Sequence, residues 1–268
     1  MANLLIVITL TLSPTLSTPT YFFLTHCSLI DVSLTSVTTS KLIIDLLYQR
    51  IIISSCGCLT QIFLEHFLGG SEIVIAIIRA YDLYVTICKP LHCRTIMRQE
   101  LCQLLVVVAW IRGILHATVQ ILCILTLTFY GSNDIDHLMC DFFSLLKLAC
   151  SAPYRLATVV AANRGAMCKL IFSMLLNSYT VILSSLKSHG SEGRHTALFK
   201  CGSYFTVVVP FFSPCVLTYM SPMTSYSVDE FVIMLFAILT PMLNPIIYTV
   251  RNTEVKSAMR ALLKRQVT

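Results

Sequence analysis

Residues 101–129 read LCQLLVVVAWIRGILHATVQILCILTLTF, an apolar run that carries one charged side chain, Arg112. A helix needs about 20 mostly apolar residues to cross the hydrocarbon core of a bilayer, and this run exceeds that length. Further long runs occupy residues 21–48, 58–87, 154–186, 197–220 and 231–250. The pattern is typical of a protein whose solvent is the lipid bilayer.

The two ends of the chain differ from these runs. The apolar run at residues 4–12 is too short to cross the hydrocarbon core, and we interpret it as the inner half of an incomplete first helix. Residues 252–265 are basic, with one apolar helical face, as expected for a helix on the membrane surface. The apolar residues of that face are Val255, Met259, Leu262 and Leu263.

The predicted fold class is therefore an all-α membrane protein. It is a seven-transmembrane helix bundle with an incomplete first helix and a short amphipathic surface helix at the C-terminus. Residues 1–250 are expected to form the transmembrane domain and residues 251–268 a cytoplasmic tail.

Composition excludes several classes of protein. Hydrophobic residues make up 56% of the 268 residues and charged residues 12%, about half the charged fraction of a soluble domain. This excludes an ordinary cytosolic enzyme, a disordered tail and a nucleic-acid-binding module. The twelve cysteines are scattered without the spacing of a zinc site, and no Ser-His-Asp constellation is evident. The sequence predicts no enzyme and no cofactor.

Basic residues predict the orientation in the membrane, because Lys and Arg concentrate in cytoplasmic segments. They gather after the third run, after the fifth run and in the tail, and these three segments fall on one side of an alternating path. The residues are Lys89, Arg94, Arg98, Lys187, Arg194, Lys200, Arg251, Lys256, Arg260, Lys264 and Arg265. That side is expected to be cytoplasmic.

Several short motifs then occur in a characteristic order. They are PTYFFL at 19–24, AYDLYVTICKPLH at 80–92, KLAC at 147–150, SEGR at 191–194 and PMLNPIIY at 241–248. In this order they resemble the olfactory receptors, a branch of the rhodopsin-like G-protein-coupled receptors, over essentially the whole chain. The resemblance implies an odorant pocket in the outer half of the bundle and coupling to a stimulatory olfactory G protein.

The pocket that the resemblance implies lies between the helices. In the third run, glycines open room beside the helix, and Glu65 is too costly in hydrocarbon to face lipid. Positions in the later runs match those used by the family. The predicted ligand-binding residues are Glu65, His66, Gly69, Gly70, Ile73, Asn163, Met167, Phe212, Cys215, Tyr219, Met234 and Ala237. The alternative is that these residues only pack helices against one another.

The resemblance also implies a disulfide bond and an activation relay. It pairs Cys58, at the start of the third run, with Cys140 in the outer loop. It makes Asp31 a candidate sodium ligand, with Asn3 and Asn244 as further interior polar groups. The residues expected to serve activation and G-protein coupling are Asp82, Leu83, Tyr84, Tyr179, Asn244, Pro245 and Tyr248. Polar contacts that only hold helices together are the alternative.

The chain departs from the family where coupling is expected. The family has Asp-Arg-Tyr after the third run, and this chain has Asp82-Leu83-Tyr84. Arg79 stands where the family usually has Met, four residues from Leu83 and hence on the same helix face. It is a candidate partner for Asp82. An interior arginine costs about 2.5–3.5 kcal/mol on insertion scales, so we expect signalling or export to be impaired.

The sequence thus predicts a multi-pass odorant receptor of the plasma membrane. It is expected to bind a small volatile ligand, to activate a stimulatory heterotrimeric G protein and to raise cyclic AMP, with membrane lipid and no nucleic acid as further partners. Two alternatives stay open. One is a non-signalling receptor remnant retained in the endoplasmic reticulum, and the other is a small multi-span transporter.

Overall fold

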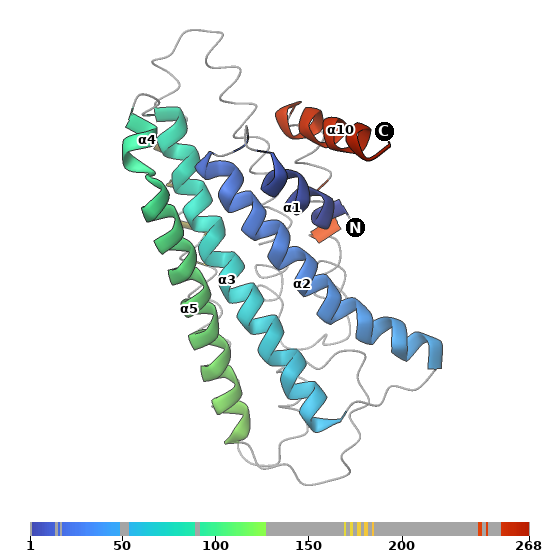
Figure 1. Ribbon diagram of the computed structural model, residues 1–268. Helices are drawn as coiled ribbons and strands as arrows, with labels where there is room; N and C mark the ends of the chain where they lie inside the picture. Colours follow the sequence, from blue (N-terminus) through green and yellow to red (C-terminus); the bar gives the residue numbers. More distant parts are fainter. Residues whose placement is uncertain are drawn as a thin grey trace.

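The computed structural model describes six helices, and the parts of the chain outside them are described only in short pieces (Figure 1). The helices are α1 (Ala2–Leu12), α2 (Pro19–Tyr48), α3 (Ser55–Cys88), α4 (Cys93–Ile96), α5 (Gln99–Leu125) and α10 (Thr253–Val267). The described residues are 2–13, 16, 18, 19–48, 54–88, 92–126, 169, 172–173, 176–177, 180–181, 184, 241–242, 245 and 253–267. Every regular element among them is helical.

The apolar runs predicted at residues 21–48, 58–87 and 101–129 correspond to α2, α3 and α5. Within the described residues, two helices are long and apolar enough to cross a membrane, at Ser55–Thr86 and Gln99–Leu125. The predicted runs at 154–186, 197–220 and 231–250 lie almost entirely outside the described residues. The short helix α4 was not predicted, because four residues are too few to show a helical period.

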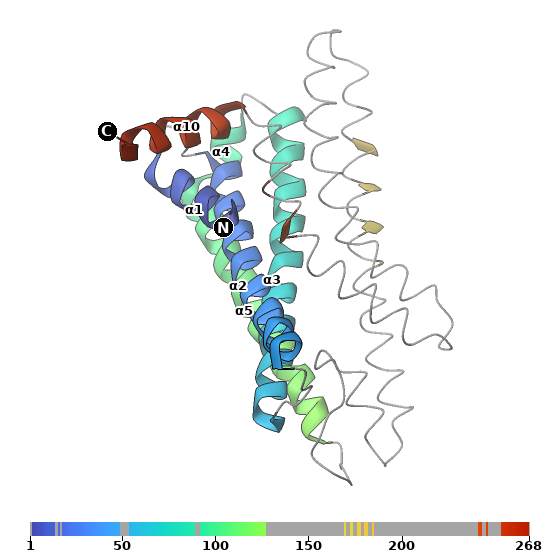
Figure 2. The ribbon, with the colours of Figure 1, turned by 90° about the vertical axis from the view of Figure 1, so that its right-hand side faces the viewer.

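The helix α3 packs against α2 on one side and α5 on the other (Figures 1 and 2). The face of α5 that turns toward α3 repeats small residues at every fourth position, namely Ala109, Gly113 and Ala117, and all three are buried. Small residues let two helix backbones approach closely, which is how helices associate in lipid. The opposite face of α5 exposes large apolar side chains, which suit lipid contact rather than water. These are Leu104, Val107, Val108, Ile111, Ile114, Leu115, Val119, Leu122 and Leu125.

Two apolar clusters join the three long helices. One is centred on Phe23 of α2 and Val85 of α3 and includes Met97, which follows α4, and Val106 of α5. The other surrounds Ile75 of α3, which is fully buried. In lipid such side chains stabilise the bundle through close van der Waals packing rather than through transfer from water.

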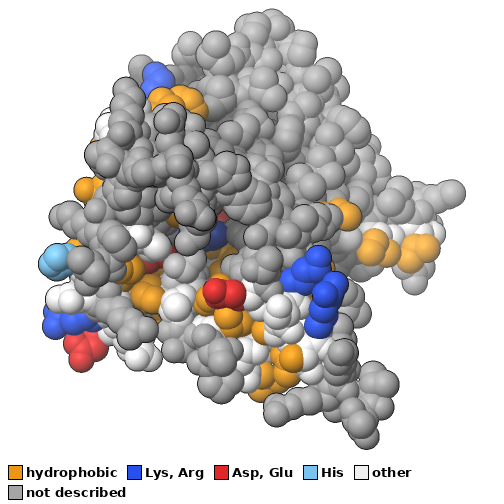
Figure 3. Space-filling view, turned by 90° about the horizontal axis from the view of Figure 1, so that it is seen from above, with side chains coloured by type: hydrophobic (Ala, Val, Ile, Leu, Met, Phe, Trp, Pro, Cys, Tyr) orange, Lys and Arg blue, Asp and Glu red, His pale blue; other side chains and the backbone are white. Residues whose placement is uncertain are grey.

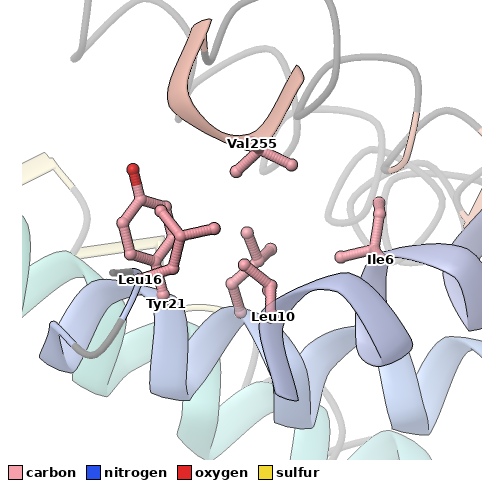
Figure 4. Close-up of a cluster of buried hydrophobic side chains, with 6 residues drawn as sticks. Ile6, Leu10, Leu16, Tyr21 and Val255 are labelled. Atoms are coloured by element: carbon pink, nitrogen blue, oxygen red, sulfur yellow. The ribbon is translucent and has the colours of Figure 1, made fainter. Parts of the chain in front are cut away.

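A third cluster holds the two ends of the chain together (Figure 4). Ile6 and Leu10 of α1 meet Tyr21 of α2 and Val255 of α10, and Leu16 and Leu24 complete the cluster. The Tyr21 hydroxyl also donates a hydrogen bond to Glu254 Oε2 at 2.5 Å. The amphipathic C-terminal helix is therefore fixed to α1 and α2 by both apolar and polar contacts.

The helices α4 and α10 lie at the same end of the bundle (Figures 1 and 2). Arg98, Lys256 and Arg260 are exposed there, and the view onto this end shows Lys and Arg side chains in separate groups (Figure 3). Cys58, at the start of α3, lies toward the opposite end. The described basic segments thus lie on one side, as the orientation rule requires.

Candidate functional site

Residues 65–73 of α3 include five of the predicted ligand-binding residues, and all five are half-buried. Gln61 donates a hydrogen bond from Nε2 to Glu65 Oε1 at 3.1 Å, one helical turn away. The ring of His66 meets the ring of His116 on α5 edge-on, with 5.6 Å between the ring centroids. A row of polar side chains therefore runs along this part of α3, inside an otherwise apolar pair of helices.

The two neighbouring glycines of α3 differ in their surroundings. A Cβ added at Gly69 would find no described atom within 4 Å. A Cβ added at Gly70 would meet Gly113 Cα and the His116 ring at 3.4 Å. Gly70 thus lies in the contact between α3 and α5, whereas no described helix packs against Gly69. For Gly70 this geometry favours the packing alternative considered above.

The later pocket positions fall outside the described residues, and their assignment stays a prediction. They are Asn163, Met167, Phe212, Cys215, Tyr219, Met234 and Ala237. Ile73 lies one turn beyond Gly69, and its side chain is half-buried. The described part of the candidate pocket therefore consists of α3 residues, with His116 of α5 beside them.

The motif at residues 82–84 lies at the other end of α3. Asp82 is 2% exposed, and its Oδ2 accepts a hydrogen bond of 2.7 Å from the Thr20 hydroxyl on α2. Tyr84 packs against the cluster around Phe23 and Val85, and Leu83 is half-buried. The carboxylate of this motif is thus directed at α2, and Leu83 adds no positive charge beside it.

Further charged groups are buried between α2 and α3. Asp31 is 0% exposed and Glu72 is 7% exposed, and they interact electrostatically with each other. Arg79 interacts with Glu72 and donates from Nη1 to Cys27 Sγ at 3.5 Å. The assignment of Asp31 as a sodium ligand stays a prediction, and Arg79 is a positive charge already present near Glu72. Among the described residues, no three His, Cys, Asp or Glu side chains are grouped to hold a metal ion.

One contact reaches the predicted seventh run. Asn3 Nδ2 of α1 donates a hydrogen bond to the Pro241 carbonyl at 2.8 Å, and Asn3 is buried. Pro245 is buried as well. The predicted relay members Tyr179, Asn244 and Tyr248 lie outside the described residues, so the relay itself stays a prediction.

Cys58 is disulfide-bonded, and the residue to which it is bonded lies outside the described part of the chain. Its pairing with Cys140 therefore stays a prediction. Burial of Cys58 at 1% exposure agrees with a cysteine held in place at the start of α3.

Sequence reasoning missed three contributors to these sites: His116, Thr20 and Cys27. Each contacts a singled-out residue on another helix, namely His66, Asp82 and Arg79. Helical spacing predicts which residues share a face of one helix, but it does not give the register between two helices. The only one of these three that the sequence could have indicated is His116, because it is a polar side chain within the apolar run at residues 101–129.

The comparisons with known proteins agree with this geometry. A sequence model described as "Olfactory receptor" matches residues 1–266. Human olfactory receptor 4S2 is 47% identical over 267 residues, which cover 100% of this chain and 86% of the relative. Human olfactory receptor 4A47 is 46% identical over 265 residues, covering 99% of this chain and 86% of the relative. Mouse olfactory receptor 4B13 is 43% identical over 266 residues, covering 99% of this chain and 87% of the relative.

These matches favour the receptor over the multi-span transporter that the sequence left open. They also agree with the predicted fold class, an all-α membrane protein with a seven-transmembrane helix bundle. The family is one of odorant-sensing G-protein-coupled receptors and is not a class of enzymes. The chain therefore belongs to the olfactory receptor family.

Proposed function

We propose that the chain is a plasma-membrane odorant receptor that binds a small volatile molecule inside its helix bundle. The observation that carries the proposal is the row of polar side chains Gln61, Glu65 and His66 on α3, next to Gly69, against which no described atom packs. A mostly apolar pocket with a few polar groups suits a small ligand that is held by burial and by one or two hydrogen bonds. The family assignment supports a ligand of the odorant class.

The proposed pocket combines these α3 residues with positions from later runs. Glu65 and His66 would supply the polar contacts, and the later positions would supply most of the apolar wall. Those later positions are Asn163, Met167, Phe212, Cys215, Tyr219, Met234 and Ala237. Their support is the resemblance to the family, together with the polar row on α3.

We further propose that the receptor acts through a stimulatory heterotrimeric G protein and raises cyclic AMP, with weakened coupling. Leu83 is the reason for the weakening, because it stands where the family has an arginine. An arginine can present several N–H donors to an acidic or carbonyl group of a partner, and a leucine has none. Asp82 is meanwhile bonded to Thr20 within the bundle.

The test is a panel of odorants applied to cells that carry a cyclic AMP reporter and an epitope-tagged receptor. Leu83→Arg is expected to raise the response at equal surface amount, and Leu83→Met is its matched control. Gly69→Leu in the Leu83→Arg background should abolish the response, because the added side chain would occupy the proposed pocket. Thr60→Leu, at an exposed position of the same helix, should leave the response intact.

The proposal fails if Leu83→Arg reaches the surface and no odorant raises cyclic AMP. It also fails in its pocket assignment if Gly69→Leu responds as well as Thr60→Leu does.

A second candidate is a non-signalling receptor retained in the endoplasmic reticulum. Leu83 favours this second candidate, because a receptor that does not couple to a G protein has no signalling function at the cell surface. Surface staining of the tagged chain separates the two candidates, because only a working receptor needs to appear outside the cell. Staining confined to internal membranes, unchanged by Leu83→Arg, is the result expected for the second candidate.

A further inference from the structure

Two acidic side chains and one basic side chain share the interior between α2 and α3. Asp31 on α2 is 0% exposed, and Glu72 on α3 is 7% exposed. Arg79 lies seven residues after Glu72, which places both on nearly the same face of α3. Two carboxylates buried without a cation would repel each other and would each lose their hydration, so they can both stay ionised only beside positive charge.

The position of the Arg79 guanidinium is given by its contact with α2. Its Nη1 donates to Cys27 Sγ at 3.5 Å, and Cys27 lies one helical turn before Asp31 on α2. Thr20, which binds Asp82, lies about two turns away from Cys27 in the other direction. Along α2, the point that Arg79 contacts is therefore nearer to Asp31 than to Thr20. Arg79 also interacts with Asp82.

Electrostatic interactions join the three groups. Glu72 interacts with Asp31 as a like charge and with Arg79 as an opposite charge. The buried Oε2 of Glu72 has no hydrogen-bond partner among the described residues, so it is free to accept from a nearby cationic donor. An arginine suits this role, because it stays protonated and offers five N–H donors to several acceptors at once.

We propose that Arg79 is the resident counter-ion of the buried Asp31–Glu72 pair, so that this chain carries in its own sequence the positive charge that a bound monovalent metal cation would otherwise supply. The guanidinium then has two consequences. It holds α2 against α3, and it makes the stability of the bundle independent of sodium.

The test measures the thermal unfolding of the purified full chain in detergent, in sodium chloride and in choline chloride at equal ionic strength. The unmodified chain is expected to have the same Tm in both salts. Arg79→Met should lower Tm in choline chloride by about 3 °C or more, and sodium should restore part of that loss. Because the readout is stability, it is independent of any odorant response.

Two variants sharpen the test. The double variant Glu72→Gln with Arg79→Met removes one acid together with the base, so it should regain Tm and lose its sodium dependence. Arg112→Met removes a cation of the same kind from α5, where it is half-buried, and should show no sodium dependence.

Three results would overturn the proposal. One is an unmodified chain that sodium stabilises as much as it stabilises Arg79→Met. Another is an Arg79→Met Tm in choline chloride equal to or above that of the unmodified chain. If Arg79→Met yields no folded protein, recovery of the double variant supports the proposal, and failure of the double variant as well overturns it.

Discussion

Replacing Gly113 with alanine is expected to push α5 away from α3. A Cβ at this position would come within 2.5 Å of the Phe67 carbonyl oxygen and closer still to Ser71 Oγ. The Phe67 oxygen is backbone and cannot move without the helix. The Ser71 hydroxyl is tied to that same oxygen by a hydrogen bond of 2.8 Å, and Ser71 is fully buried. Neither obstacle can rotate out of the way at low cost.

The size of the effect follows from two opposing contributions. Overpacking costs about 1–3 kcal/mol, and a backbone obstacle places this site near the upper end. Alanine in place of glycine stabilises the helix by about 1 kcal/mol, because alanine has the higher helix propensity. The net loss is about 2 kcal/mol, which corresponds to a fall in Tm of about 4–8 °C for a chain of this size.

Gly69→Ala is the matched control, because it makes the same chemical change in α3 with no described atom within 4 Å. It should leave Tm unchanged or raise it by about 2–4 °C, since only the propensity gain remains. Gly70→Ala should fall between the two, because its nearest neighbours lie at 3.4 Å. The assay is the fraction of tagged protein that stays monodisperse in detergent after heating. A Gly113→Ala Tm within about 1 °C of the Gly69→Ala value would refute the close packing of α3 on α5.

Three further substitutions test contacts between helices. Tyr21→Phe removes the hydroxyl that binds Glu254, and it should free α10 enough to speed proteolysis of the tail, at a cost of about 1 kcal/mol. An unchanged cleavage rate would contradict that contact. Thr20→Val keeps the shape but leaves the buried Asp82 carboxylate without its hydroxyl donor, so Tm should fall as expected for a loss of about 1–3 kcal/mol. Val255→Ala removes apolar atoms from a fully buried position and should destabilise the docked tail by about 1–2 kcal/mol, again seen as faster proteolysis.

The helices could be predicted from the sequence because apolar length is a local property. The apolar runs at 58–87 and 101–129 correspond to α3 and α5, with boundaries that differ by a few residues. Helix ends are set by the first and last backbone hydrogen bonds rather than by hydropathy. For example, α3 begins at Ser55, before its apolar run starts.

The contacts between helices could not be predicted in the same way. The spacing of Arg79 and Leu83 predicted that both lie on one face of a helix, but it did not show that Cys27 would meet the guanidinium. The row at Glu65 and His66 was predicted, and its neighbour His116 was not, because the register of α5 on α3 depends on close contact at Gly70 and Gly113. The register of α5 on α3 depends on how the surfaces of both helices fit together, which the spacing of residues along one helix does not show.

The cluster that joins Tyr21 to Glu254 and Val255 spans a separation of 233 residues in the chain. At synthesis rates of about 5–20 residues per second, the first helices wait on the order of 10–50 s before the segment that covers them exists. During that interval Ile6, Leu10 and Tyr21 can only be sheltered by lipid or by a chaperone. A chain that ends before Val255 therefore lacks the side chain that packs on Ile6 and Leu10, and those residues keep their temporary cover of lipid or chaperone.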